Sequence, residues 1–504
     1  MKIPTGWERC EISQVLATQD NGKLLKQGWS PKCEKHPAPT DSDWGVLKTT
    51  SIQSGAFLAE HNKALPDSLH PKPGLEVAAG DLLLTCAGPR SRCGIPCLVR
   101  STRPRLMVSG KMYKMRASRQ VLPAFAEAWL LTSEAQQAVD RMKTGGSDSG
   151  LNLTQGRFLR LPFPLAPLPE QGRIVAKMES LFAGLDEGLA ALNRARANLE
   201  RYRASVLKAA VEGRLTGGWR AENPPEESGE LLLARIATTD VDSCGPPFGR
   251  RHDDLPNGWG KAPVAALIRE PLRNGKSARA SSDGQGVRTL TLSAVTEGDF
   301  SQRNTKLTTV APNKVSSLWL EAEDILVERS NTPELVGLAR MYCGPANYAI
   351  FPDLLIRVRC DQRISAAFVE FCLQSPEARS YFRSRARGSS GSMPKINQTT
   401  VAELTLPLPP RTEQDEVVAR CRNLLSEADV LQRELAMASR RVGSLRQSIL
   451  TRAFEGRLVP QDPEDEAASV ILERIRAERK AEKTRRQRQS RLTKLNRERQ
   501  DGDS

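Results

Sequence analysis

The chain has 504 residues, 39% of them hydrophobic and 26% charged, which is an ordinary composition for a protein with two or three globular domains. Its formal net charge of +15 favours a polyanionic partner such as nucleic acid, the alternative being a basic protein whose charge only aids solubility. No apolar run approaches the roughly 20 residues that a membrane-spanning helix needs, so an integral helical membrane protein is excluded.

The start of the chain and its cysteines predict a cytoplasmic protein. Residues 1–9 lack the apolar core of a secretory signal. The ten cysteines are scattered along the chain rather than framed by close repeats. Reduced thiols are therefore expected in place of disulfides.

Residues 1–165 are predicted to form a first globular module. Short β-like runs occur at Asp81–Thr85 and Arg105–Val108, and one helical stretch covers Ala124–Met142. Short strands combined with one clear helix predict a mixed α/β (α+β) domain.

The chain then repeats itself. Asp81-Leu-Leu returns as Asp324-Ile-Leu, and Glu212-Gly-Arg-Leu returns as Glu455-Gly-Arg-Leu, each 243 positions later. A period of this length indicates a duplicated domain with a duplicated connector rather than a solenoid. The second module is predicted over residues 253–410, with strands at 324–328 and 349–359 and a helix at 366–386.

Each module ends in a proline-rich bend, and a long helical segment follows, over residues 166–220 and 411–460. Apolar residues in these segments follow steps of four and three, the pattern of a coiled-coil seam. The interval from the Glu-Gln joint to the Glu-Gly-Arg-Leu end is 42 residues in both segments (170 to 212 and 413 to 455). This equality favours their pairing with each other in antiparallel orientation over separate docking on the modules. The predicted seam residues are Ile174, Met178, Leu181, Leu185, Leu192, Leu199, Val206, Val417, Leu424, Leu431, Leu435, Val442, Leu445 and Ile449.

Two further segments follow the long helices. Residues 221–252 are polar, with several prolines and glycines, and are predicted to be a linker with a short helix. Residues 461–504 are predicted to be a short helix followed by a basic tail. That tail either binds phosphates or a partner subunit, or is a solvated terminus.

The sequence contains no complete catalytic set. Only four histidines are present, which disfavours acid/base catalysis by histidine. Cys33-x-x-His36 and three nearby cysteines form a loose set, but the spacing is irregular and the second module has no counterpart. We therefore expect no catalytic residue, no metal ion and no cofactor in this chain.

Polar loops recur at matching places in both modules, and they predict DNA contacts. DNA-binding surfaces use Lys, Arg, Ser, Thr and Asn to hold phosphates and to reach base edges. One loop follows the Asp81 or Asp324 strand, and the other precedes the proline-rich bend. The candidate DNA-binding residues are Arg90, Ser91, Arg92, Lys143, Asn152, Arg329, Ser330, Asn331, Thr332, Arg387, Ser389, Ser390 and Lys395.

Together these features resemble the specificity subunits of type I restriction-modification systems. The resemblance rests on the Pro-x-Gly-Trp openings at Pro4 and Pro256, the Gly-Ser-x-x-x-x-Pro-x-Ile-Asn stretch at 388–397, and the Glu-Gln joints after the proline bends. It also rests on the helix ends at 205–215 and 448–458. It covers nearly the whole chain, although residues 145–152 match the polar-loop pattern only loosely.

The resemblance implies two target recognition domains, residues 1–165 and 253–410, separated by two long α-helices that form an antiparallel coiled coil with pseudo-two-fold symmetry. It implies a non-catalytic subunit that binds double-stranded DNA with a bipartite target. Its expected partners are two methyltransferase subunits and restriction/translocase subunits, which would carry S-adenosylmethionine, ATP and Mg. The alternatives are the recognition subunit of another multi-subunit methylation system and a coiled-coil adaptor that binds proteins.

Overall fold

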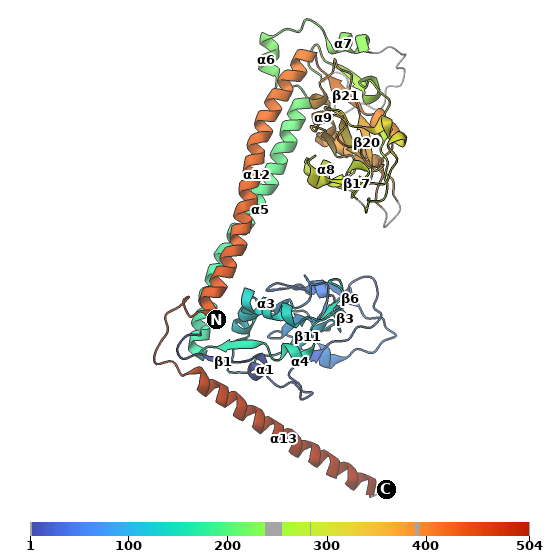
Figure 1. Cartoon of the computed structure of the whole chain (residues 1–504). Coiled ribbons are helices and arrows are strands. Elements are labelled where there is room, and N and C mark those ends of the chain that lie inside the picture. Colours follow the sequence, from blue (N-terminus) through green and yellow to red (C-terminus); the bar gives the residue numbers. More distant parts are fainter. Residues whose placement is uncertain (1–2, 237–254, 283, 389–392, 503–504) are drawn as a thin grey trace. The chain divides into compact units, whose positions relative to one another are not determined.

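The computed structural model describes residues 3–236, 255–282, 284–388 and 393–502, with side chains up to residue 488. The chain divides into two compact units, residues 1–191 with 438–504 and residues 192–437. Each unit holds one module together with parts of two 44-residue helices, α5 (Leu168–Val211) and α12 (Arg411–Phe454) (Figure 1). Two long helices and two modules of mixed helix and sheet are therefore present, as predicted.

The first module is built on an antiparallel sheet in the order β2–β11–β7–β9. The central strand β7 is buried along its length, because its run of leucines faces core on both sides. The strands of this sheet are β2 (Lys26–Gln27), β7 (Leu82–Thr85), β9 (Pro96–Leu98) and β11 (Met112–Met115). The module's other strands are β1 (Glu8–Glu11), β3 (Gly45–Leu47), β4 (Ile52–Gln53), β5 (Ala56–Phe57), β6 (Asn62–Ala64), β8 (Ala87–Gly88), β10 (Leu106–Met107), β12 (Leu151–Asn152) and β13 (Pro162–Leu165).

The second module repeats that sheet in the order β15–β20–β18–β19, also antiparallel. The predicted strand over residues 349–359 is shortened to β20, because Pro352 lacks the amide that a central strand must donate. The strands of this module are β14 (Gly260–Pro263), β15 (Arg273–Asn274), β16 (Val287–Leu290), β17 (Thr305–Thr308), β18 (Ile325–Glu328), β19 (Ala339–Met341), β20 (Leu355–Val358) and β21 (Thr405–Leu408).

A buried aspartate precedes the central strand in both modules. Asp81 accepts a hydrogen bond from Arg116 Nε at 2.6 Å, and Asp324 accepts one from Arg359 Nε at 2.6 Å. Each aspartate also accepts a backbone N–H from the residue three positions earlier. Both members of the pair recur 243 positions later, so the sequence repeat corresponds to a repeated structural contact.

The single helix predicted in each module is two helices. The hydroxyl of Thr132 accepts from Ala135 N at 3.1 Å, and that of Ser375 accepts from Ala378 N at 3.3 Å. A capping hydroxyl satisfies the free amides of a new first turn, so the chain turns and a second helix begins. The helices of the modules are α1 (Ile12–Val15), α2 (Pro123–Leu130), α3 (Ser133–Met142) and α4 (Gln155–Phe158), then α8 (Leu292–Glu297), α9 (Ala366–Gln374), α10 (Pro376–Arg385) and α11 (Gln398–Ala402).

A buried carboxylate joins each module to the first turn of the long helix that follows it. Trp7 Nε1 donates to Glu170 Oε2 at 2.9 Å, and Trp259 Nε1 donates to Glu413 Oε2 at 2.8 Å. Both glutamates are 2% exposed. The Pro-x-Gly-Trp openings and the Glu-Gln joints are therefore the two sides of one contact.

Within each unit, α5 and α12 lie antiparallel. In the first unit Arg446 forms an ion pair with Asp186, and in the second Arg203 forms one with Asp429. From 203 to 186 the step along α5 is 17 residues, and from 429 to 446 the step along α12 is also 17 residues. One antiparallel register accounts for both pairs, which confirms the predicted pairing.

The residues predicted for the seam differ in burial. Five residues are buried (Ile174, Met178, Leu199, Val206 and Val417), and seven are half-buried (Leu181, Leu185, Leu192, Leu424, Leu435, Val442 and Ile449). Leu431 and Leu445 are 51% and 46% exposed, so their assignment to the seam was wrong. A straight helix has 3.6 residues per turn, so its buried stripe drifts from a strict heptad, and near its end α12 buries Leu450, Ala453 and Phe454 instead.

The end of each long helix packs into a module. Phe454, the last residue of α12, lies 4.9 Å from Phe125 and 5.2 Å from Trp129 between ring centroids in the first module's core. The end of α5 packs likewise into the core of the second module, through Val206, Leu207, Ala210 and Val211. Each core is therefore completed by the end of the long helix that follows the other module in the sequence.

The segments after the long helices match the prediction in part. α7 (Gly229–Ile236) lies where a short helix was predicted in the linker, α6 (Gly217–Glu222) begins before the linker, and residues 237–252 fall outside the described residues. The short helix expected after residue 461 is the beginning of a 35-residue helix, α13 (Ala468–Gly502). No helix in the described part of the chain is long and apolar enough to cross a lipid bilayer.

The buried joint predicts a large stability effect. Glu413→Ala removes the acceptor for Trp259 and for Arg220, whose Nη2 lies 2.6 Å from Glu413 Oε1. Leaving a buried partner charge uncompensated is expected to lower the free energy of unfolding by about 3 kcal/mol. Urea denaturation of the full chain measures this.

The matched control is Glu416→Ala, three residues further along α12. Glu416 forms an i,i+4 ion pair with Arg420 at the surface, so its loss is expected to change stability by less than about 0.5 kcal/mol. Equal effects of the two substitutions would contradict the role given to the joint.

Candidate nucleic-acid interface

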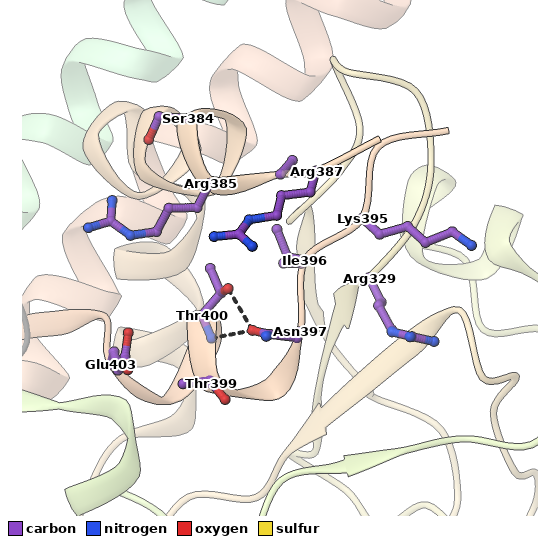
Figure 2. A pocket seen from close by; sticks show the side chains of 11 residues that line it. Arg329, Ser384, Arg385, Arg387, Lys395, Ile396, Asn397, Thr399, Thr400 and Glu403 are labelled. Carbon is purple, nitrogen blue, oxygen red and sulfur yellow. Dashed lines mark hydrogen bonds between the residues drawn. The ribbon is translucent and has the colours of Figure 1, made fainter. Parts of the chain in front are cut away.

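A pocket of about 540 Å³ in the second module gathers several basic side chains. Figure 2 shows Arg385 and Arg387 on one side of Asn397, and Arg329 and Lys395 on the other. The residues that line it are Arg329, Ser384, Arg385, Ala386, Arg387, Lys395, Ile396, Asn397, Thr399, Thr400 and Glu403. Two loops that the sequence predicted separately are thus brought to one place.

Backbone hydrogen bonds hold the pocket together. Arg387 N donates to Lys395 O and Lys395 N donates to Arg387 O, both at 2.9 Å, which closes a hairpin after α10. Ile396 N donates to Arg329 O at 2.9 Å and ties this hairpin to the end of β18. Asn397 then caps α11 through a 2.8 Å bond from Thr400 N.

The charge of the pocket suits an anion. It contains four cations and one carboxylate, Glu403, and no ion pair to any of the four cations occurs within the described residues. Arg329 donates through Nη1 to Asp353 O at 3.3 Å, while its buried Nε has no partner there. Arg385 lies over the ring of Tyr381 at 4.0 Å. Like charges that line one pocket repel one another, and a bound anion relieves this repulsion.

The other candidates of the second module have different positions. Ser330 is 1% exposed, and Asn331 Nδ2 donates to Glu328 Oε2 at 2.6 Å. Burial raises the pKa of Glu328, which Thr296 and Asn331 partly offset by hydrogen bonding. Ser330 and Asn331 therefore shape the loop rather than line the pocket. Thr332 is exposed, and Ser389 and Ser390 lie outside the described residues.

In the first module, the predicted basic residues already have internal partners. Arg90 forms ion pairs with Asp140 at 2.7 Å and with Asp148 at 3.0 Å. Lys143 donates to Asp140 Oδ1 at 2.9 Å with only 7% of its side chain exposed. Arg92 donates from Nη2 to Ile52 O at 2.8 Å. Lys143 and Arg92 thus hold the loops of this module in place.

Ser91 and Asn152 are exposed in the first module. Asn152 belongs to the hairpin that matches the one in the second module, with bonds of 2.8 Å and 2.7 Å between Thr144 and Asn152. Their contact with DNA stays a prediction.

The two modules place their basic residues differently on the same backbone. Four positions of the first module correspond to positions of the second by the sequence offset and by the backbone hydrogen bonds around them. They are Cys86 with Arg329, Met142 with Arg385, Thr144 with Arg387, and Asn152 with Lys395. Conversely, the first module has Arg157 and Arg160 where the second has Thr400 and Glu403. Sequence reasoning missed Arg385. The signal was its place at the end of a basic helix directly before the hairpin.

Within the described residues, no group of three or more His, Cys, Asp or Glu side chains is arranged to hold a metal ion. The cysteines of the first module at positions 10, 86, 93 and 97 are buried, and burial raises the pKa of each thiol.

Comparison with known proteins identifies the family. No protein-family model matches the chain. It is 27% identical over 497 residues to the type I restriction enzyme StySPI specificity subunit of Salmonella potsdam, covering 95% of this chain and 96% of that protein. It is 25% identical over 500 residues to the EcoKI specificity subunit of Escherichia coli K12, covering 95% and 97%. The chain belongs to the specificity subunits of type I restriction enzymes.

Two further comparisons bear on this specificity subunit. Over 187 residues it is 35% identical to the EcoEI specificity subunit of Escherichia coli, a match that covers 37% of this chain and 30% of that protein. Its fold is similar to a chain from a study of complex assembly and conformational transition of the type I R-M system. The TM-score is 0.58 at 19% identity, with 91% of this chain and all of the other covered. The latter comparison shows the fold alone.

The pocket predicts distinct effects for basic residues that line it and for a basic residue that holds a loop. Arg329→Gln and Lys395→Gln each remove one cation from the pocket, so the slope of log K against log salt for DNA binding should fall by about 0.9 per lost phosphate contact. The measurement is a salt titration of duplex binding by the subunit with its methyltransferase partners.

Arg92→Gln is the contrasting variant. Its guanidinium is bonded to backbone carbonyls, so this change should lower the unfolding temperature and leave the salt slope unaltered. Unchanged slopes for both Arg329→Gln and Lys395→Gln would reject the pocket as a DNA contact.

Proposed function

We propose that this specificity subunit binds a bipartite sequence in double-stranded DNA and scaffolds the catalytic subunits of a type I restriction-modification complex. The observation that carries the proposal is the duplication of a complete module, joined through the same buried contact to each of two antiparallel helices. The chain itself contributes recognition and assembly and no catalytic residue.

Symmetry connects this fold to the form of its target. The two units repeat one architecture, a module joined to an antiparallel pair of helix segments, and duplex DNA has local two-fold symmetry of its own. Two such modules face the same side of the duplex when their half-sites lie about one helical turn, roughly 34–36 Å, apart. The target is therefore two half-sites separated by a gap that neither module reads.

The partners follow from the family and remain part of the proposal. Two methyltransferase subunits would bind along the helical segments and use S-adenosylmethionine to methylate adenine. Restriction subunits would use ATP and Mg to translocate and cleave DNA. The exposed apolar residues of α12, among them Leu431 and Met437, are available to such partners.

The direct test is selection from random duplex DNA by the full chain with its methyltransferase subunits. Two conserved blocks separated by a fixed number of unconserved positions are expected. A single uninterrupted block would contradict the proposal. Absence of any selected sequence would favour the protein-binding adaptor.

The helices predict a further outcome of that selection. Inserting four residues near Asn193 lengthens α5 by about 6 Å. This should change the preferred gap between the half-sites while the base sequence of both half-sites stays the same. The comparison is the selected gap of the inserted chain against that of the natural chain. The same gap in both would reject the idea that helix length sets it.

A further inference from the structure

Helix α13 continues far beyond the contacts that hold it to the first module. Its first turns bury Ala468, Ile471, Leu472 and Ile475 in the core of that module. The corresponding helix of the other copy, α7, ends at Ile236 after eight residues. α13 instead extends to Gly502, so about three quarters of it has no counterpart in α7.

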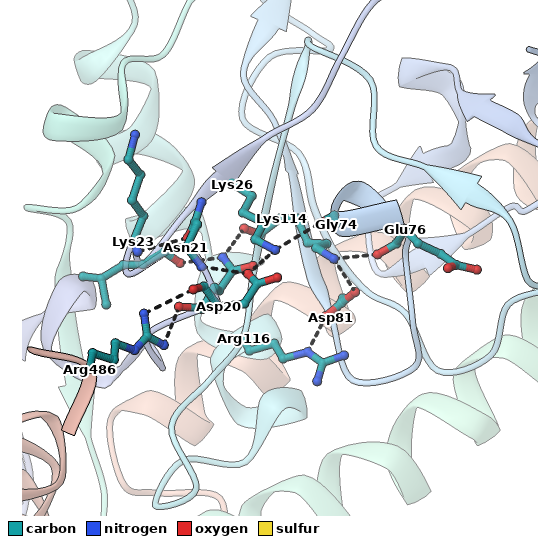
Figure 3. Close-up of polar contacts among 12 residues, drawn as sticks. Asp20, Asn21, Lys23, Lys26, Gly74, Glu76, Asp81, Lys114, Arg116 and Arg486 are labelled. Atoms are coloured by element: carbon teal, nitrogen blue, oxygen red, sulfur yellow. Dashed lines mark hydrogen bonds and ion pairs between the residues drawn. The ribbon is translucent and has the colours of Figure 1, made fainter. Parts of the chain in front are cut away.

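Two arginines fix the direction of α13 against the first module. Arg479 Nη2 donates to Ser13 O at 2.6 Å, and Arg486 Nη2 donates to Gln19 O at 2.7 Å. The loop that receives Arg486 is itself held to the sheet, because Asp20 forms an ion pair with Lys26 (Figure 3). The helix is thus seated on a fixed surface of the module along about five turns.

The remaining cations of this segment face solvent. Arg476, Lys480, Lys483, Arg485 and Arg488 are all exposed. Within the described residues none of these five forms an ion pair, whereas Arg474 and Arg486 pair with glutamates. Their charge is therefore available to a ligand.

The density of charge identifies the kind of ligand. Between residues 483 and 497 the sequence has seven Lys or Arg and no Asp or Glu. At a rise of 1.5 Å per residue this segment is about 21 Å long, or one cation per about 3 Å. One strand of duplex DNA carries a phosphate about every 3.4 Å along its axis. Such a helix repels itself in isolation and matches the charge spacing of a nucleic-acid backbone.

A protein surface fits this segment less well. A helix that docks on protein needs an apolar stripe, and between residues 476 and 500 the only apolar residues larger than alanine are Leu492 and Leu495. The sequence after α7, residues 237–254, has Arg250 and Arg251 with four aspartates, so the basic run belongs to one copy only.

We propose that α13 beyond Ile475 is a DNA-binding arm that holds the phosphate backbone of duplex flanking the half-site bound by the first module. This inference rests on the proposed function for the presence of a half-site. It adds a second, sequence-independent DNA contact, which the duplicated architecture does not supply.

The test uses the full chain with its methyltransferase subunits and two duplexes that carry the selected target. The short duplex ends at the target, and the long one extends it by about two helical turns on each side. The variant K480Q/K483Q/R485Q/R488Q removes four exposed cations and keeps good helix formers. The charge-preserving control is K480R/K483R/R485K/R488K.

The natural chain and the control should bind the long duplex more tightly than the short one. The glutamine variant should lose most of that gain, and its salt slope on the long duplex should fall by about 0.9 per lost contact, up to between about 3 and 4. Its selected half-sites should stay unchanged.

Equal gains from the flanks in the natural chain and the glutamine variant would overturn the inference. The inference would also be overturned if the glutamine variant failed to assemble with the methyltransferase while its flank-dependent affinity gain and its salt slope stayed unaltered. The arm would then bind protein. A natural chain that selects no bipartite target but still shows charge-dependent duplex binding would reject the proposed function and leave the arm in place.

Discussion

The structure depends on a buried hydrogen bond from a tryptophan indole to a glutamate carboxylate, made once in each unit. Trp7 and Glu170 form it in the first unit and Trp259 and Glu413 in the second. A carboxylate that is 2% exposed is tolerated only with partners, so the module opening and the first turn of its helix are held together. The turn after the opposite long helix packs on the module opening through a glycine with positive φ, Gly213 against Pro256 and Trp259 and Gly456 against Pro4. Module, helix start and helix end are therefore held together in each unit. Both joints share the Trp–Glu hydrogen bond, and Glu413 accepts additional bonds from Thr216 and Arg220.

Equivalent scaffolds carry unlike surfaces. The buried residues are constrained by packing, so the aspartate–arginine pairs, the capping hydroxyls and the joints recur at a constant offset. The hairpin after α3 or α10 is free of that constraint, and there the first module has Thr144 and Asn152 where the second has Arg387 and Lys395. Loops on a rigid scaffold are where binding specificity commonly lies. Two modules with one backbone and different basic residues are suited to two different half-sites.

Much of this architecture could be predicted from the sequence because duplication is visible in the letters themselves. The repeat predicted both modules, both helices and their antiparallel pairing. Other features depend on contacts that a pattern does not encode. Apolar and helix-forming residues continue across Ser375, so the break between α9 and α10 was missed, although Ser375-Pro376 is a capping signal. Leu431 fitted the heptad and is exposed, because the buried stripe drifts along a straight helix. Arg90 and Lys143 had the composition of a DNA-binding loop, but both form ion pairs with Asp140. Asp140 is 50 residues from Arg90 in the sequence, and its pairing with Lys143 was not considered.

The central claim is that each module reads its own half of the target. Because both joints contain the same Trp–Glu hydrogen bond, residues 3–167 can be replaced by a second copy of residues 255–410 with this contact retained. The decisive measurement is the genome-wide methylation map of cells that carry this chain, natural or with the copied module, together with its methyltransferase. The account predicts a bipartite, asymmetric motif for the natural chain and an inverted repeat of the second half-site for the altered one. An uninterrupted motif, or the same asymmetric motif from both chains, would contradict it.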